Sequence, residues 1–379
     1  MSLRREPYRL FFPLGLLLGW AGVLHWLLHG AGWLANYRPV FHAIAQVQGF
    51  LMCFAAGFLF TAIPRRTETE GPSGRQMGLV ALCAVGTTVC AWFQWFGLSQ
   101  LCWLILVGTL IGFALGRVRG ASAGRKPPNS FVWIPLSLLT GVVGSLLIGA
   151  YGILGDEYYG LHELGRLLLL QAMFLGLVLG AGGMVLPLIA YGRSAGDGST
   201  TPGDRLARGA HLLAALLLAG SFWWEWRGDL QAAFVIRAAI LAAVLALGSG
   251  LWRRPTVAGW HRRWIWLSAW MLPLGCLIVA LFPLQKKAGL HVVFIGGLAT
   301  MAFGVGMHVT LAHGGHERLV RGRPWQVPFY GALFMTAMVA RGLMEFDQER
   351  YFVWMMLAAG AFVAATLFWA ALALPRLRR

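Results

Sequence analysis

Charged residues are scarce in this sequence. Only 12% of the 379 residues are charged and just 14 are acidic, whereas soluble domains are about 25% charged. Hydrophobic residues make up 58% of the chain, and the mean hydropathy is +0.67. This composition excludes a soluble enzyme, a disordered chain and a protein with a single membrane anchor. Because apolar runs of roughly 20 residues recur from end to end, it predicts an all-α polytopic membrane protein.

Cysteine is also sparse, and no two cysteines form a C-x-x-C pair. The pattern therefore excludes a disulfide framework and a zinc knuckle, and the absence of C-x-x-C-H excludes covalently attached haem. The five cysteines all lie inside or at the edge of apolar runs: Cys53, Cys83, Cys90, Cys102 and Cys276.

Breaks that carry charge, glycine or proline divide the chain into about twelve expected spans, which form one domain over residues 1–379. The third and fourth spans are separated only by Gly97 and residues 98–100. The expected spans are 11–33, 39–63, 77–96, 98–116, 131–154, 161–191, 206–226, 230–252, 264–283, 289–313, 325–345 and 351–374.

The net charge of +17 would suggest nucleic acid as a partner of a soluble protein, but here the basic residues lie between spans. Lys and Arg number 23 in the loops on the N-terminal side and seven on the other side. This bias favours an even number of helices with both termini in the cytoplasm. We therefore expect the lipid bilayer, and no nucleic acid, as the partner of this surface.

A weak repeat appears when the spans are grouped in fours. The first, fifth and ninth spans share a Pro-Leu motif, and the second, sixth and tenth each open with a histidine: His42, His162 and His291. Four helices per unit would give three repeats in the same orientation. The alternative is that Pro-Leu is simply common in membrane helices.

The expected topology sorts the ten histidines into two groups by depth. Ionisable groups inside spans are costly and mark functional sites. His291 and His308 are seventeen residues apart on one helix, roughly 26 Å, so two separate sites are predicted. Toward the outer face lie His25, His29, His42, His162 and His291. Toward the cytoplasmic face lie His211, His261, His308, His313 and His316.

Imidazole suits haem iron, copper and zinc, so the outer group predicts a metal or haem site. His42 and His291, on different helices at one depth, are expected to be the two axial ligands of a haem, or one haem ligand beside a ligand of a neighbouring metal. His25 and His29 share a helix face and form a candidate bidentate metal site, as the i, i+4 spacing allows. His162 is the remaining outer candidate. The alternative for each is an interfacial histidine bonded to a nearby carbonyl.

Arginines near the outer face support a haem site, because a guanidinium pairs well with haem propionates. Arg166 lies one turn after His162, Arg237 lies two turns into its span, and Arg341 lies near the outer end of the eleventh span. The alternative is local pairing of Arg341 with Glu345, and of Arg237 with Asp229.

Two further features concern the interior of the spans. No carboxylate lies deep in a span, so a proton relay of the Asp/Glu kind is not expected. In the sixth span, Gly180-Ala-Gly-Gly183 precedes Pro187. This motif either breaks the helix and lines a site or simply allows close packing of helices.

Several of these stretches resemble the NnrS family, which are haem- and copper-containing bacterial membrane proteins linked to nitric-oxide stress and denitrification. The resemblance covers most of the chain and the same twelve-span plan. It rests on Pro7-Tyr-Arg-Leu-Phe-Phe12, Phe41-His-Ala-Ile-Ala-Gln-Val-Gln-Gly-Phe50, Gly57-Phe-Leu-Phe-Thr-Ala-Ile-Pro64, Ala181-Gly-Gly-Met-Val-Leu-Pro187, and the tenth span from His291 through Val309-Thr-Leu-Ala-His313-Gly-Gly.

The resemblance implies that His42, His291 and His313 bind cofactor. The chain departs from the family pattern at residues that would hold a second metal. Of the family's H-x-H-E pattern it keeps only His42, and Ile44 and Ala45 occupy the other two places. The usual arginines of the sixth and tenth spans are Met184 and His308. The resemblance thus implies that the protein binds haem b. It implies copper less strongly, because two ligands of the family pattern are missing.

The hypothesis that follows is a haem-binding protein of the bacterial inner membrane, acting in the response to nitric oxide or its detoxification. Nitric oxide or a similar diatomic molecule would bind at a His-ligated haem, and a haem-dependent oxidoreductase activity is one form this could take. The alternatives are a twelve-helix secondary transporter without a redox cofactor and an assembly partner of a respiratory complex. The sequence does not determine the oligomeric state.

Overall fold

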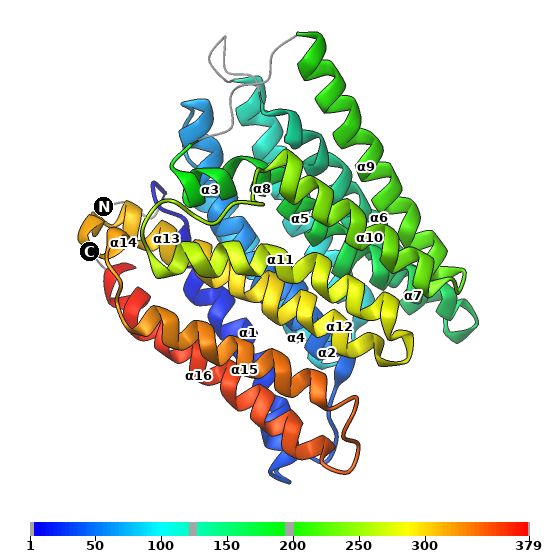
Figure 1. Cartoon of the computed structure of the whole chain (residues 1–379). Helices are drawn as coiled ribbons and strands as arrows, with labels where there is room; N and C mark the ends of the chain where they lie inside the picture. The colour runs from blue at the N-terminus through cyan, green and yellow to red at the C-terminus, as the bar shows by residue number, and fades with distance from the viewer. Residues whose placement is uncertain (1–3, 121–126, 194–200, 378–379) are drawn as a thin grey trace.

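The protein is helical throughout the part that the computed structural model describes, residues 4–120, 127–193 and 201–377. Figure 1 shows long helices that run side by side between two ends of the molecule. Both termini lie at one end, which we call the terminal face, and we call the other end the distal face. The predicted all-α class is confirmed.

Each third of the expected pattern corresponds to helices in the structure. The first four spans are α1 (Tyr8–Gly30); a continuous rod of α2 (Pro39–Ile44), η1 (Ala45–Leu51) and α3 (Met52–Thr67); α4 (Gly74–Trp92); and α5 (Phe96–Arg119). The next four are η2 (Asn129–Val132) with α6 (Trp133–Leu154); η3 (Asp156–Tyr158), α7 (Tyr159–Leu167), η4 (Leu168–Ala172) and α8 (Met173–Tyr191); α9 (Pro202–Trp226); and α10 (Leu230–Ala243) with η5 (Val244–Gly248).

The last four spans follow the same order. They are α11 (Trp260–Leu281); η6 (Pro283–Gln285), α12 (Lys286–His291), η7 (Val292–Ala299) and α13 (Thr300–His313); α15 (Gln326–Leu343); and α16 (Tyr351–Leu377). A short helix, α14 (Glu317–Arg321), connects α13 to α15. Within the described ranges, eleven of the twelve rods are long and apolar enough to cross a membrane. The twelfth, α15, has 18 residues but is less apolar than the others.

The boundary between the third and fourth spans differs from the expected one. The chain turns at Phe93, Gln94 and Trp95, with Gln94 in the left-handed region (φ 63°), and not at Gly97. Gly97 is instead the second residue of α5. The turn is therefore made by a polar residue in a conformation that Asn and Gly usually supply, which hydropathy does not indicate.

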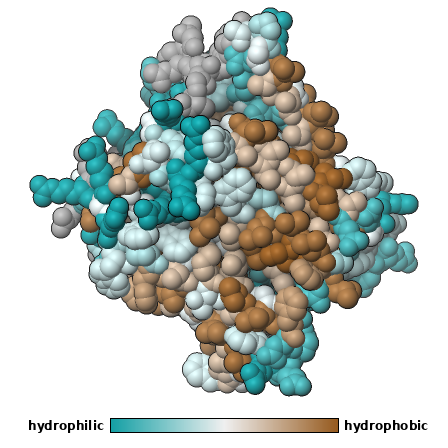
Figure 2. All heavy atoms as spheres, viewed as in Figure 1, coloured by the Kyte–Doolittle hydropathy of each residue, from teal (hydrophilic) through white to brown (hydrophobic). Residues whose placement is uncertain are grey.

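The surface agrees with a membrane-spanning bundle. In Figure 2 apolar side chains cover the middle of the visible face, and hydrophilic side chains gather near the termini and at the opposite loops. Exposed leucines and tryptophans cover α9, including Leu213, Leu216 and Trp223. A band of this kind suits lipid chains between two polar interfaces.

The three rods that begin with a histidine are the inner helices of the bundle. Their most apolar stretches are 72%, 67% and 67% buried, against 22–56% for the other candidate spans. Each inner helix contains a π-helical segment shortly after its histidine: η1, η4 and η7. Such segments widen one turn and often lie at functional sites. A fourth π-helical segment, η5, ends the outer rod α10, so the feature is not confined to the inner helices.

Packing between the repeats also follows one rule. The last rod of each repeat packs against the first rod of the next, α5 on α6 and α10 on α11, and α16 packs against α1 to close the ring. Inside two repeats, the first rod touches the inner helix through glycines. A Cβ on Gly144 would lie 2.6 Å from the Gly165 carbonyl oxygen, and one on Gly275 would lie 2.6 Å from the Gly289 carbonyl oxygen.

These contacts predict that Gly275→Ala destabilises the protein. The added methyl group meets backbone atoms that cannot move aside, and overpacking of this kind costs about 1–3 kcal/mol. Gly108→Ala is the matched control, because nothing lies within 4 Å of its added Cβ. We expect a lower thermal unfolding midpoint in detergent for Gly275→Ala and an unchanged or slightly higher one for Gly108→Ala. Equal midpoints would show that the close approach is not tight.

Candidate functional site

His42 lies near the start of the first inner helix, on the distal face. Its Nδ1 is 2.7 Å from the carbonyl oxygen of Gly22 and 2.9 Å from Nε1 of Trp26. A carbonyl only accepts, so the Gly22 contact forms when Nδ1 carries the proton, and the lone pair is then on Nε2. In the other tautomer, Trp26 donates to Nδ1. The first tautomer is the one that a metal ligand needs.

His291 ends α12 and has the same arrangement at the start of the third inner helix. Its Nδ1 lies 2.7 Å from the carbonyl oxygen of Lys287, one turn earlier. The proton is therefore held on Nδ1 and the lone pair is left on Nε2. Ligating histidines usually fix their orientation and tautomer through such a bond to a carbonyl or carboxylate. The His291 ring is thus oriented by a backbone carbonyl, and the His42 ring by the Gly22 carbonyl or by Trp26, according to its tautomer.

These two imidazoles are 249 positions apart in the chain, and each lies near the distal end of an inner helix. His42 and His291 lie within electrostatic range of each other, and the charge of Arg341 acts on both rings. Arg341 comes from the distal end of α15 and donates from Nη1 to Glu345 at 3.2 Å. The alternative interpretation of Arg341, local pairing with Glu345, is confirmed. The site therefore combines two imidazoles and one guanidinium from three different rods.

Two more histidines border this group from α1. His25 is only 3% exposed, and its ring centroid lies 6.2 Å from that of His42. Neither of its ring nitrogens has a hydrogen bond of good geometry, although the carbonyls of Ala21 and Gly22 are near. His29 is held by the Leu34 carbonyl, 2.9 Å from Nδ1. Across the described ranges, no three His, Cys, Asp or Glu side chains gather closely enough to hold a metal ion by themselves.

His162 and Arg166 lie elsewhere on the distal face. The His162 ring contacts Tyr151 and Tyr159, with centroids 5.0 and 5.7 Å away. Arg166 pairs with Glu163 at 3.0 Å, and both side chains are over 40% exposed. Their helix, α7, packs with α6 and α9, whereas α2 packs with α1 and α4, and α12 with α11 and α15. The second repeat thus does not add its histidine to the His42–His291 group.

Arg237 is fully buried and belongs to an ion-pair network. It pairs with Glu225, and its Nε and Nη2 donate to Oγ and the carbonyl oxygen of Ser221 at 2.9 and 3.0 Å. Lys286 approaches the other Glu225 oxygen at 2.6 Å. The alternative pairing of Arg237 with Asp229 is wrong: the Asp229 carboxylate caps α10 by accepting from the Ala232 amide at 3.1 Å. The network ties α9 and α10 to the first turn of α12, next to His291.

A second histidine group lies toward the terminal face. His308 on α13 and His261 on α11 stack, with His308 Nδ1 3.2 Å from His261 Nε2. His313 hydrogen-bonds Arg65 and lies 6.1 Å from the ring of Tyr8. This group is separated from His291 by the length of η7 and α13, as expected. The prediction of two separate histidine groups agrees with the structure.

One buried polar contact of the first inner helix was not predicted from the sequence. The amides of Gln48 and Gln100 exchange two hydrogen bonds of 3.0 and 3.1 Å, and Ser145 donates to Gln100 at 2.8 Å. These side chains are at most 1% exposed. Uncharged polar residues inside spans were the available signal, since lipid-buried amides need partners. The contact joins the first inner helix to α5 and α6.

The chain belongs to the NnrS family: the model of the NnrS protein family matches residues 2–379. It is therefore a multi-pass membrane protein of a family whose membership implies involvement in the nitric-oxide response. No curated protein matches the chain.

Proposed function

We propose that this protein binds haem b between His42 and His291 and acts on nitric oxide through that haem. The observations that carry the proposal are that His42, His291 and Arg341 lie within range of mutual charge interaction, and that a backbone carbonyl oxygen lies 2.7 Å from Nδ1 of each imidazole. Either both are axial ligands, or one ligates the haem and the other lies beside it.

The residues present fit a haem better than a metal ion alone. Porphyrin supplies the four equatorial ligands, so the protein needs to add only one or two side chains. Arg341 provides a cation for a propionate, with Glu345 holding the guanidinium in place. Copper fits less well, because Ile44 and Ala45 occupy two of the family's metal-binding positions. We therefore base the proposed chemistry on haem and not on copper.

Each side chain has a physical task in this proposal. The carbonyls of Gly22 and Lys287 hold the two rings and keep their Nε2 lone pairs available. The positive charge of Arg341 stabilises negatively charged groups near both rings. His25, buried and unpaired beside His42, is a neutral acceptor or donor close to the bound group. When present, a ferrous haem supplies an axial position at which nitric oxide binds.

The membrane arrangement belongs to the same proposal. The excess of basic residues in the loops of the terminal face orients that face to the cytoplasm of a bacterium. The haem site, near the distal face, would then be close to the periplasmic surface of the inner membrane. Reporter fusions at residue 379 and within the Glu345–Arg350 loop should report opposite sides of the membrane.

The decisive experiment is the absorption spectrum of the purified protein. Protein from haem-replete cells should show a Soret band and a b-type pyridine haemochrome, and nitric oxide added to the reduced protein should shift the Soret band. A colourless preparation without iron, from cells in which a control b-type cytochrome is fully loaded, would contradict the proposal. Such a result would favour the secondary transporter instead.

A further inference from the structure

A partly open cavity lies between the three inner helices. It has a volume of about 150 Å³, and every residue that lines it is apolar or glycine. Its walls come from α3, α8 and the η7–α13 segment, with Phe12 of α1 at one side. One wall thus comes from each of the three repeats.

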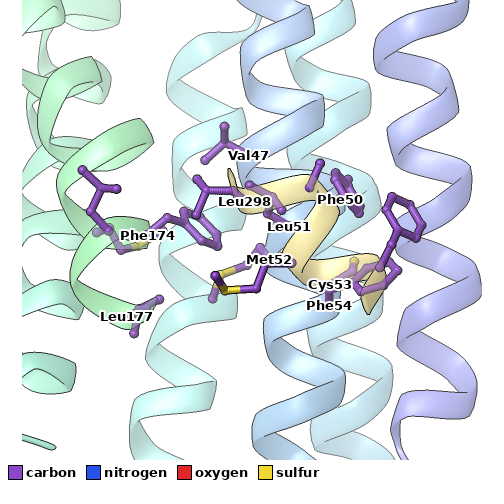
Figure 3. Packing of buried hydrophobic residues seen from close by; sticks show 14 of the residues in the cluster. Val47, Phe50, Leu51, Met52, Cys53, Phe54, Phe174, Leu177 and Leu298 are labelled. Carbon is purple, nitrogen blue, oxygen red and sulfur yellow. The ribbon is translucent and has the colours of Figure 1, made fainter. Parts of the chain in front are cut away.

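The packing of the inner helices explains why space is left there. The first inner helix is joined to α13 by aromatic contacts: the rings of Phe50 in η1 and Phe54 in α3 each lie 5.1 Å from the ring of Phe303. From α16, Trp369 Nε1 donates to the Phe303 carbonyl at 2.8 Å. By contrast, α8 packs mainly against α6 and α11. The cavity lies between α8 and the α3–α13 pair. In Figure 3, Phe174 and Leu177 extend from α8 toward Leu298 and Met52 across this region.

The glycine motif of the sixth span contributes to the space in a defined way. Added Cβ atoms on Gly180 and Gly183 would meet Ile134 and Ser130 at 2.8 and 2.5 Å, so these two glycines serve the packing of α8 on α6 and η2. Ala181 and Gly182, between them, line the cavity. The motif therefore both packs the helix and opens the cavity, and it leaves the helix unbroken through Pro187.

The chemistry of the walls determines what can enter. Water gains no hydrogen bonds from an apolar wall, and an apolar cavity of about 150 Å³ stays dry and takes xenon or benzene. Charged and strongly polar solutes are excluded by the cost of desolvation. A small, neutral, apolar molecule is the occupant that matches both size and polarity, and uncharged diatomic gases meet both conditions.

The cavity is also connected with the histidine site through the chain itself. Leu51, at its edge, ends η1, and Leu298 lies within η7. These two π-helical segments begin three residues after His42 and one residue after His291. A molecule that leaves the cavity toward the distal face therefore meets the segments that carry both imidazoles.

We infer that this cavity is a binding site for an uncharged diatomic gas, which it holds within the membrane before the gas reaches the histidine site. That the gas is nitric oxide rests on the proposed function; that the cavity binds a gas does not. The inference assigns a role to Ala55, Ala181 and Ala302, whose small side chains are half-buried although they lie on inner helices.

Xenon tests the cavity without using haem. Full-length protein in nanodiscs, purified from haem-depleted cells, should bind xenon, seen as a xenon-dependent shift of the ¹³C-methyl signal of Met301, which lines the cavity. Ala302→Leu fills the space and should abolish the shift. Ala332→Leu, the same change at an exposed position of α15, should retain it. No shift in the unchanged protein, a shift kept in Ala302→Leu, or an acyl chain found in the cavity would each overturn the inference.

A second experiment measures delivery of gas from the cavity to the haem and compares nitric oxide with dioxygen. In haem-loaded protein, Ala302→Leu should lower the rate constant for rebinding of nitric oxide after flash photolysis severalfold, with an unchanged Soret spectrum before photolysis. The same measurement with dioxygen shows whether the cavity serves both gases. Xenon binding in a protein that never loads haem would reject the proposed function and leave the cavity assignment standing. Unchanged rebinding in Ala302→Leu would overturn delivery through the cavity.

Discussion

His291→Ala is expected to remove most of the Soret absorbance of the purified protein. Its imidazole is one of the two proposed axial ligands, and no other described histidine on the third inner helix lies near the distal face. Loss of one axial ligand from a bis-histidine site leaves haem weakly held. If the second position is empty, the remaining ligand instead gives a shifted, high-spin spectrum. The measurement is the ratio of Soret to protein absorbance after purification.

His162→Ala is the matched control for this variant. His162 also opens an inner helix on the distal face, but it contacts tyrosines of the second repeat. Its removal should leave the spectrum unchanged. A monodisperse elution profile shows that His291→Ala is folded, and imidazole added to His291→Gly should restore part of the absorbance by filling the vacated position. Full Soret absorbance in both His291→Ala and His42→Ala would reject the assignment of these ligands.

The sequence predicted the parts of this structure that depend on hydropathy and topology. Twelve spans follow from the apolar runs, and an even number of spans between His42 and His291 puts both imidazoles near one face. The depth of a residue in a span is a one-dimensional property. It could therefore be counted along the chain, and His42 and His291 both lie near the distal ends of inner helices, as that count predicts.

The side of a helix on which a residue finds its partner could not be counted along the chain in the same way. Glu225 and Asp229 flank one short turn, and both are within reach of a residue two turns into α10. The structure pairs Arg237 with Glu225 because this carboxylate is buried with Ser221 against the same side of α10, while Asp229 is used as a helix cap. The π-helical segments add to the difficulty, since each one changes the rotation of every residue that follows it.

The cavity between the inner helices could not be predicted from the sequence for a related reason. Its existence depends on three helices from three repeats and on how closely their side chains approach. The glycine motif of the sixth span indicated either close packing or a site, and the structure assigns different residues of the motif to each. Gly180 contacts Ile134, whereas Gly182 lines the cavity. A pattern in one helix cannot distinguish these roles without the neighbouring helices.

Glu225→Ala should destabilise the protein more strongly than Gly275→Ala. Arg237 is 0% exposed, and without Glu225 its charge would remain buried with only Ser221 and two aromatic rings as partners. Removing one partner of a buried ion pair costs about 3–5 kcal/mol. Lys286 would also lose its contact at the start of α12, so the haem signal should weaken along with stability. The thermal unfolding midpoint and the Soret ratio measure the two effects.

Two comparisons distinguish burial from charge pairing as the cause of the destabilisation expected for Glu225→Ala. Glu163→Ala breaks an Arg–Glu pair of similar geometry that is over 40% exposed, and exposed pairs contribute only about 0–1 kcal/mol. A double variant, Glu225→Leu with Arg237→Met, removes both charges and should recover much of the lost stability, because apolar groups of similar volume replace buried pairs without a large penalty. If Glu225→Ala is no worse than Glu163→Ala, the guanidinium of Arg237 has access to water or another anion. If instead the double variant is as unstable as Glu225→Ala, the network contributes through its hydrogen bonds to Ser221 and Lys286 more than through the burial of an unpaired charge.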